Sequence, residues 1–107
     1  MISIDEFQKL ELKVGTVVEA SDVEESEKLI KLMIDLGEDQ PRQILAGIKQ
    51  WYKPKDFMGK QVVVVVNLEP KMMMGLQSQG MMLAADADGG PIFLTVSKKV
   101  PAGTKIR

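Results

Sequence analysis

The chain contains neither cysteine nor histidine among its 107 residues. Without cysteine it has no disulfide bond and no thiolate chemistry, a composition that suits the cytoplasm, where we expect the protein. Without histidine it lacks the commonest general base near neutral pH and the commonest transition-metal ligand. Its paired acids, Glu24-Glu25 and Glu38-Asp39, lie in polar loops with no nucleophile beside them. We therefore expect no catalytic residue, no cofactor and no metal site.

Long apolar stretches are missing as well. The run Val62–Val66 has five apolar residues, far fewer than the roughly 20 that a membrane helix needs. The acidic, mixed N-terminus has no signal-peptide pattern. We expect no membrane segment. The length predicts a single domain over residues 1–107, because two cores would not fit.

The charges are unevenly distributed, although the net charge is only −1. Residues 1–39 hold eleven acids and four bases, a net −7, and residues 40–107 hold four acids and ten bases, a net +6. This asymmetry allows two faces of opposite charge, of which the basic one would meet a polyanion. The alternative is that the two halves interleave in space and their charges mix.

The apolar patterns predict short strands and two short helices. The expected strands are Leu12–Glu19, Leu29–Leu36, Arg42–Ala46, Val62–Leu68, Met81–Ala85 and Ile92–Val96, with a short end strand in the tail. Gly15 marks a possible bulge or bend in the first strand. Ser3 and Glu6 have the spacing of a capping box, which predicts a helix within Ser3–Leu10. A second helix is expected within Trp51–Met58, with Pro54 in its first turn.

Five or more short strands with non-local pairing favour a barrel, because closure removes exposed strand edges. The helix expected before the fourth long strand has the position that it occupies in an OB-fold. We therefore predict an all-β protein, a five-stranded OB-fold barrel with a short helix between strands three and four and a short N-terminal helix.

Residues 70–85 hold five of the eight methionines. Methionine thioethers can bind soft metals, but consecutive residues of an extended chain point to opposite sides, which favours packing or adaptable contact instead. The insert Gly75–Gly80 predicts a tight turn with its amides and the Ser78 hydroxyl facing outwards. Such a turn is either ordinary or a contact for a base or a phosphate.

Lysines and aromatic residues are interleaved between Lys49 and Lys55. Proteins that bind single-stranded nucleic acids combine lysines that contact phosphates with rings that stack on bases. Trp51 and Tyr52 are two of only five aromatic residues, so the alternative is that one or both belong to the core.

Five segments carry a resemblance to a known family. They are Leu12–Val17, Ser26–Leu29, Arg42–Ile48, Gly59–Leu68 and Met74–Met81. The chain resembles the tRNA-binding domain found at the C-terminus of bacterial methionyl-tRNA synthetases, in separate beta subunits of that synthetase and in stand-alone dimeric tRNA-binding proteins. The run Ser78–Met81, preceded by Asn-Leu at this distance, is its most specific part.

The resemblance implies an OB-fold that binds tRNA by shape and has no activity of its own. It places RNA-binding positions at Lys28, Ser78 and Met81, and also at Arg42 and Asn67. It further implies a role in delivering or retaining tRNA for a methionyl-tRNA synthetase, whose catalytic subunit is then a possible partner.

The resemblance also implies a homodimer that pairs through the chain ends, here Ser3–Leu10 and Pro91–Arg107. The chain departs from many relatives in the acidic run Val23–Glu27, which leaves Lys28 as the main positive contact of its loop. A chaperone of the CsaA type, which binds unfolded polypeptides, is the alternative function, because methionine-rich surfaces suit promiscuous apolar binding.

Overall fold

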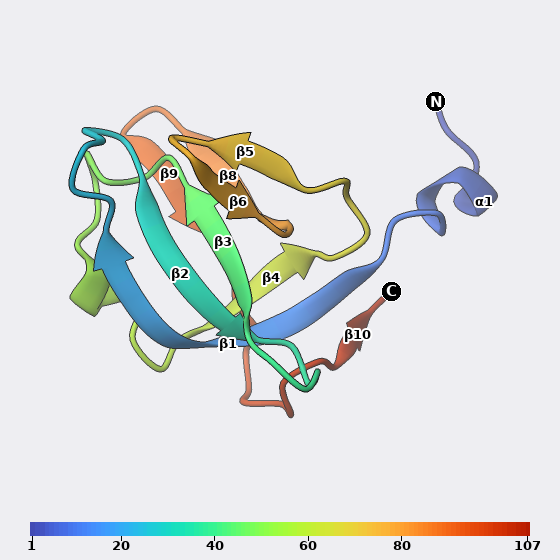
Figure 1. Cartoon of the computed structure of the whole chain (residues 1–107). Helices are drawn as coiled ribbons and strands as arrows, with labels where there is room; N and C mark the ends of the chain where they lie inside the picture. Colours follow the sequence, from blue (N-terminus) through green and yellow to red (C-terminus); the bar gives the residue numbers. More distant parts are fainter.

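The computed structural model describes the whole chain, residues 1–107, and its centre is a sheet that curls into a nearly closed barrel (Figure 1). The barrel strands are β1 (Leu12–Asp22), β2 (Ile30–Asp35), β3 (Arg42–Ala46), β4 (Gln61–Val65) and β7 (Met81–Met82). They pair antiparallel in the order β3-β2-β1-β4-β7, and β10 (Lys105–Ile106) pairs with the start of β1. This confirms the predicted five-stranded OB-fold barrel.

Alternating and continuous apolar patterns place the core as expected. In β2 the side chains of Ile30, Leu32 and Ile34 are buried, and those between them are half-buried. All five residues of β4 are buried, and the strand pairs with β1 along one edge and with β7 along the other. Phe57, fully buried, packs into the same core from the segment before β4.

The first strand is longer than predicted, and its irregularity lies elsewhere. The register with β2 shifts between Val17 and Glu19, so the bulge is not at Gly15. Gly15 is required for close packing instead, since a methyl group there would clash with Cγ2 of Ile34. The strand can therefore bend sharply around the core and pair with β2, β4 and β10 along its length.

Both predicted helices are shorter than expected. The N-terminal helix α1 (Ile4–Phe7) is one turn, which begins where the Ser3 hydroxyl accepts a hydrogen bond from the amide of Glu6. The second is only a 3-10 turn, η1 (Pro54–Asp56), and the chain reverses soon after it at Gly59, which has a φ of +74°. No helix of the structure is long and apolar enough to cross a membrane.

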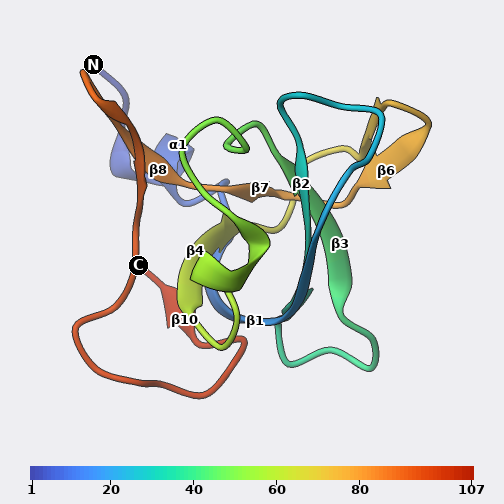
Figure 2. The same ribbon diagram turned by 90° about the vertical axis from the view of Figure 1, so that its left-hand side faces the viewer.

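Two small hairpins extend from the barrel. The first pairs β5 (Lys71–Met73) with β6 (Leu76–Ser78), and the second pairs β8 (Ala84–Ala87) with β9 (Gly90–Phe93). The expected turn at Gly75–Gly80 is therefore wrong. The turn consists of Met74 and Gly75, whose φ values of +52° and +77° give the backbone twist that two-residue hairpins require. The first hairpin stands at the same end of the barrel as the loop between β1 and β2 (Figure 2).

Candidate nucleic-acid interface

The segment Gln77–Gly80 lies along β3, which would otherwise be an open edge of the sheet. The amides of Gln43 and Leu45 donate hydrogen bonds to the side-chain oxygens of Gln79 and Ser78, each at 3.0 Å. The amide of Gln79 donates to the carbonyl of Gln43 at 2.8 Å, and the side-chain amide of Gln43 donates to the carbonyl of Gln77. Side-chain atoms thus replace a strand partner, and the edge of β3 is covered.

Ser78 does not face solvent as the sequence predicted. Ser78 is only 4% exposed. Its hydroxyl accepts a hydrogen bond from the Leu45 amide and donates one to the carbonyl of Gly80 at 3.1 Å. The strand β6 turns this side chain inward because it must satisfy the buried amide of Leu45. The outward-facing hydroxyl is therefore a correction, and a contact between Ser78 and RNA stays an untested prediction.

Gly80 allows this close approach. Its φ is +153°, and a methyl group on it would lie 2.9 Å from the carbonyl oxygen of Val65 and 3.3 Å from Cδ1 of Ile44. The chain can consequently pass directly over the end of β4 before it forms β7, which holds Ser78 and Met81 in fixed positions.

Arg42 connects three parts of the chain. Its Nη1 donates to the carbonyls of Val66, at 2.6 Å, and Gln79, at 3.1 Å. Its Nε and Nη2 each donate to a carboxylate oxygen of Glu38 at 2.8 Å. The hydrogen bond from Arg42 and the charges of Arg42 and Lys13 hold the pKa of Glu38 below its usual value, against a smaller effect of burial. The guanidinium is thus engaged within the protein.

Asn67 is likewise engaged, although it is exposed. Its side-chain oxygen accepts from the amide of Glu11 at 2.9 Å, and its side-chain nitrogen donates to the carbonyl of Lys9 at 2.6 Å. Asn67, which follows the end of β4, therefore holds the segment Lys9–Glu11 between α1 and β1 in place. Contacts of Arg42 and Asn67 with RNA remain untested predictions.

Lys28 lies where the sequence placed it, exposed in the loop between β1 and β2. The hydroxyl of Ser26 accepts from the amides of Lys28 and Leu29, both at 3.1 Å. The ammonium of Lys49 donates to the carbonyl of Ser26 at 2.8 Å. The loop is therefore held from within, while the Lys28 side chain has no hydrogen-bond or ion-pair partner in the protein.

Acidic residues surround the same loop. A cleft of about 330 Å³ separates it from the tip of the β5–β6 hairpin. It is lined by Asp22, Val23, Glu24, Glu25, Lys31, Met74 and Leu76. Three carboxylates against one lysine disfavour a phosphate there. No group of His, Cys, Asp or Glu in the chain is arranged to hold a metal ion.

An apolar groove of about 310 Å³ runs between the end of β3, the β5–β6 hairpin and β7. Met73 and Met82 are half-buried in it, and Met81, 47% exposed, stands at its border together with exposed Lys71. Flexible methionines accommodate several shapes. The groove can therefore accept the face of a base or a ribose, with Lys71 available for a phosphate.

The two central aromatic residues have different environments. Tyr52 is half-buried, packs against Phe57 and Phe93 with ring centroids 5.1 and 5.9 Å away, and donates to the carbonyl of Pro91. Trp51 is 49% exposed and lies over Gly90, where a methyl group would approach the indole to 2.5 Å. Tyr52 therefore belongs to the core, and one face of Trp51 is covered by β9.

Sequence reasoning missed Gln43 and Gln79, which make the reciprocal hydrogen bonds between β3 and the Gln77–Gly80 segment. Both are ordinary polar residues, and only the pairing of distant segments reveals their role. The available signal was that β3 needed a covered edge.

A five-stranded β-barrel whose open edge is covered by the Gln77–Gly80 segment defines an OB-fold domain, a class that binds oligonucleotides or oligosaccharides. Residues 12–105 match the family model described as "Putative tRNA binding domain". The chain belongs to this tRNA-binding domain family, as its resemblance predicted.

Relatives of known sequence include methionine–tRNA ligases. That of Methanocaldococcus jannaschii is 51% identical over 107 residues, which cover 99% of this chain and 16% of the ligase. That of Caldanaerobacter subterraneus is 45% identical over 98% of this chain and 16% of the ligase. The chain thus spans about a sixth of the length of these relatives, and it is a tRNA-binding domain homologous to part of them.

Solved structures give the same fold. A MetRS-related protein from Pyrococcus horikoshii has a TM-score of 0.92 and 37% identity, with 100% of this chain and 98% of that chain covered. The chaperone CsaA from Bacillus anthracis has a TM-score of 0.88 and 35% identity, with coverage of 100% and 99%.

Proposed function

We propose that this chain binds folded tRNA by shape and delivers or retains it for a methionyl-tRNA synthetase in the cytoplasm, without a reaction of its own. The observation that supports this most strongly is the match of residues 12–105 to the tRNA-binding family, together with 51% identity to a stretch of a methionine–tRNA ligase. The catalytic subunit of such a synthetase is then its second partner.

In this proposal, contacts are divided by chemistry. Lys71 and Lys28, which does not line the acidic cleft, are both exposed and bind phosphates, which provides affinity with little choice of sequence. Met81 and the apolar groove accept a base or ribose. Arg42, Asn67 and Ser78 hold the loops in place, since their polar atoms are bonded within the protein.

Titration with unmodified tRNA at several salt concentrations tests the function. We expect the logarithm of the affinity to fall linearly with that of the salt concentration, and tRNA to bind more tightly than a DNA duplex of equal charge. The variant Lys28→Ala should bind more weakly, with Lys9→Ala as the matched control. A slope near zero, or equal affinity for the duplex, would reject the proposal.

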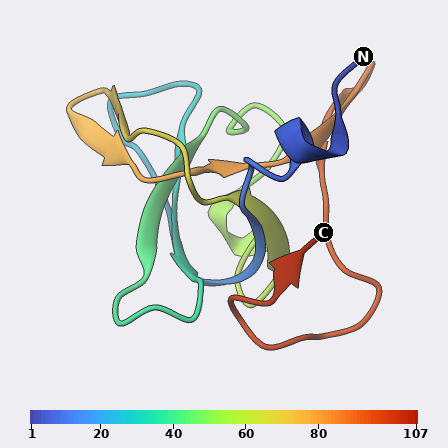
Figure 3. The same ribbon diagram turned by 90° about the vertical axis from the view of Figure 1, so that its right-hand side faces the viewer.

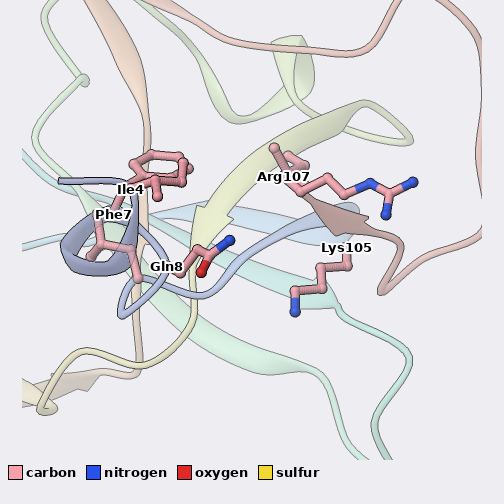
Figure 4. A pocket seen from close by; sticks show the side chains of 7 residues that line it. Ile4, Phe7, Gln8, Lys105 and Arg107 are labelled. Atoms are coloured by element: carbon pink, nitrogen blue, oxygen red, sulfur yellow. The ribbon is translucent and has the colours of Figure 1, made fainter.

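The chain also forms a homodimer in this proposal, through α1 and β10. None of the residues of α1 is buried, and Ile4 and Phe7 are 67% and 37% exposed. They line a groove of about 490 Å³ together with Lys105 and Arg107, which lie on its other side in Figure 4. Acidic Asp5 and Glu6 of one copy can meet these bases in the other under a two-fold axis.

Sedimentation equilibrium tests the pairing. We expect twice the chain mass, and the chain mass for Phe7→Glu, whereas the control Met72→Glu, at a 63% exposed position of the β5–β6 hairpin, should stay dimeric. A monomer at all concentrations would leave this face for the synthetase subunit instead.

The CsaA-type chaperone is the second candidate function, favoured by the methionine-lined groove and by solved CsaA structures at TM-scores of 0.88 and 0.91. The two functions respond oppositely to salt. Binding of an unfolded polypeptide should hold or strengthen as salt is added, whereas tRNA binding should weaken.

A further inference from the structure

A basic cleft lies at the end of the barrel away from the β5–β6 hairpin. It has a volume of about 250 Å³ and is lined by Gly59, Lys60, Gln61, Thr95, Val96, Ser97, Lys98 and Lys99. Three lysines from two separate segments thus meet without any carboxylate among the lining residues. All three are exposed and none forms an ion pair, since the single ion pair of the chain joins Arg42 and Glu38.

The backbone of this cleft is fixed from within by a buried glutamine. Gln61, 8% exposed, donates from its side chain to the carbonyl of Val100 and accepts from the amide of the same residue at 3.0 Å. Its main-chain carbonyl accepts from the Thr95 hydroxyl at 2.7 Å. Both ends of the four-residue loop Val96–Lys99 are therefore attached to the first residue of β4.

The opposite wall is equally well held. The carbonyl of Lys60 accepts from the amide of Val17, and its amide donates to the carbonyl of Phe57, both at 2.9 Å. The positions from which the lysines project are thus set before any partner binds, which reduces the entropy lost on binding.

We propose that this basic cleft binds the phosphodiester backbone of the RNA, as a second contact separate from the apolar groove. The inference rests on the proposed tRNA-binding function. Only Val96 among the lining residues is apolar, so the cleft offers no surface for stacking a base and would contact phosphates without reading sequence. The free hydroxyl of exposed Ser97 adds a neutral hydrogen-bond donor for a phosphate oxygen.

The two contacts lie at opposite ends of β4. Gln61, its first residue, borders the basic cleft, and Val65, its last, pairs with Met81 of the groove. Four residue-to-residue steps along the strand separate them, roughly 13 Å at 3.3 Å per residue. The loop 95–104 and the β5–β6 hairpin lie on opposite sides of the barrel in Figure 2. A single nucleotide cannot bridge these sites, whereas a folded RNA can.

The test compares tRNA binding by the wild-type chain, the triple variant Lys60→Ala/Lys98→Ala/Lys99→Ala, the double variant Lys98→Ala/Lys99→Ala and the matched control Lys53→Ala/Lys55→Ala. The control removes the same charge as the double variant, from two exposed lysines outside the cleft. These lysines follow Tyr52, which belongs to the core, so the structure does not support the stacking contact that their stretch suggested. We expect the triple variant to bind roughly 10- to 100-fold more weakly at low salt, with a salt slope smaller by about two, and the control to change less than about threefold. Exposed lysines carry no core contact, so unchanged thermal unfolding is expected throughout.

Four results would overturn the inference. One is an unchanged slope in the triple variant, and another is an equal loss in the double variant and the control, which would indicate net charge only. Polyglutamate serves as a second, acidic ligand in the same assay. A third contrary result is that the triple variant loses binding to polyglutamate while it retains binding to tRNA, which would make the partner an acidic protein. Absence of tRNA binding by the wild-type chain would instead reject the proposed function, and this inference with it.

Discussion

The two ends of the barrel differ in what their polar groups do. At the hairpin end, the family's signature residues are mostly engaged within the protein: Ser78 satisfies a buried amide, and Arg42 satisfies two carbonyls. At the opposite end, Lys60, Lys98 and Lys99 are exposed and form no ion pair around a cleft. The loop that carries Lys98 and Lys99 lies on the same side of the molecule as β10 (Figure 3). The residues that identify the family therefore indicate how the site is held together, whereas the charged side chains without a partner in the protein indicate which ligand it binds.

Arg42 is expected to give the largest loss of stability. Arg42→Met should lower the free energy of unfolding by about 2–3 kcal/mol, because the carbonyls of Val66 and Gln79 lose a charged donor. Urea unfolding measures this, with Glu38→Gln as the control that keeps both bonds. A loss below about 1 kcal/mol would show that Arg42 is not a structural part of the hairpin end.

Ser78 separates the structural role from direct recognition. Ser78→Ala should cost about 2 kcal/mol of stability, since the buried amide of Leu45 loses its acceptor. Ser21→Ala is the matched control, a half-buried serine of β1 whose hydroxyl forms no hydrogen bond. If Ser78→Ala instead reduced tRNA affinity with stability unchanged, the hydroxyl would be a direct RNA contact.

Much of the fold could be predicted because burial leaves a local pattern. The alternation through Ile30, Leu32 and Ile34 and the apolar run of β4 placed the barrel strands to within a few residues. The orientation of Ser78 could not be predicted, since it depends on the amide of Leu45, 33 residues away. Equally, Lys60 and Lys98 line one basic cleft because Gln61 forms hydrogen bonds with Thr95 and Val100, and no spacing along the chain indicates this arrangement.

The hairpin tip offers a stabilising change of moderate size. Met74 has a φ of +52°. This left-handed conformation is energetically unfavourable for methionine, whereas asparagine adopts it readily. Met74→Asn should therefore raise the free energy of unfolding by about 0.5–1 kcal/mol, which thermal unfolding measures, with exposed Met72→Asn as the control. Because Met74 is 56% exposed, a stabilised variant with weaker tRNA binding would place the tip in the interface.

The ion pair of Arg42 and Glu38 gives the smallest expected effect, and it depends on pH. The hydrogen bond and charge of Arg42, with a contribution from Lys13, lower the pKa of Glu38 in the folded state from its usual 4.5. A lowered folded pKa means that the contribution to stability is complete above the usual value and is lost as pH falls through the folded one. The pair is about one-third exposed, with side chains 25% and 36% accessible, so solvent screening limits the effect to less than about 1 kcal/mol.

Comparison of the wild-type chain with Glu38→Gln isolates this contribution. The difference in free energy of unfolding should be constant from pH 8 to pH 5, shrink below pH 4.5 and decrease with added salt. A difference that persists unchanged at pH 3 would mean that the negative charge of Glu38 is not its cause, because both chains keep the Arg42 contacts with the carbonyls of Val66 and Gln79. That result would sharpen the contrast between the ends, since the stability of the hairpin end would then not depend on the charge of this pair, whereas RNA binding at the basic cleft should depend strongly on salt.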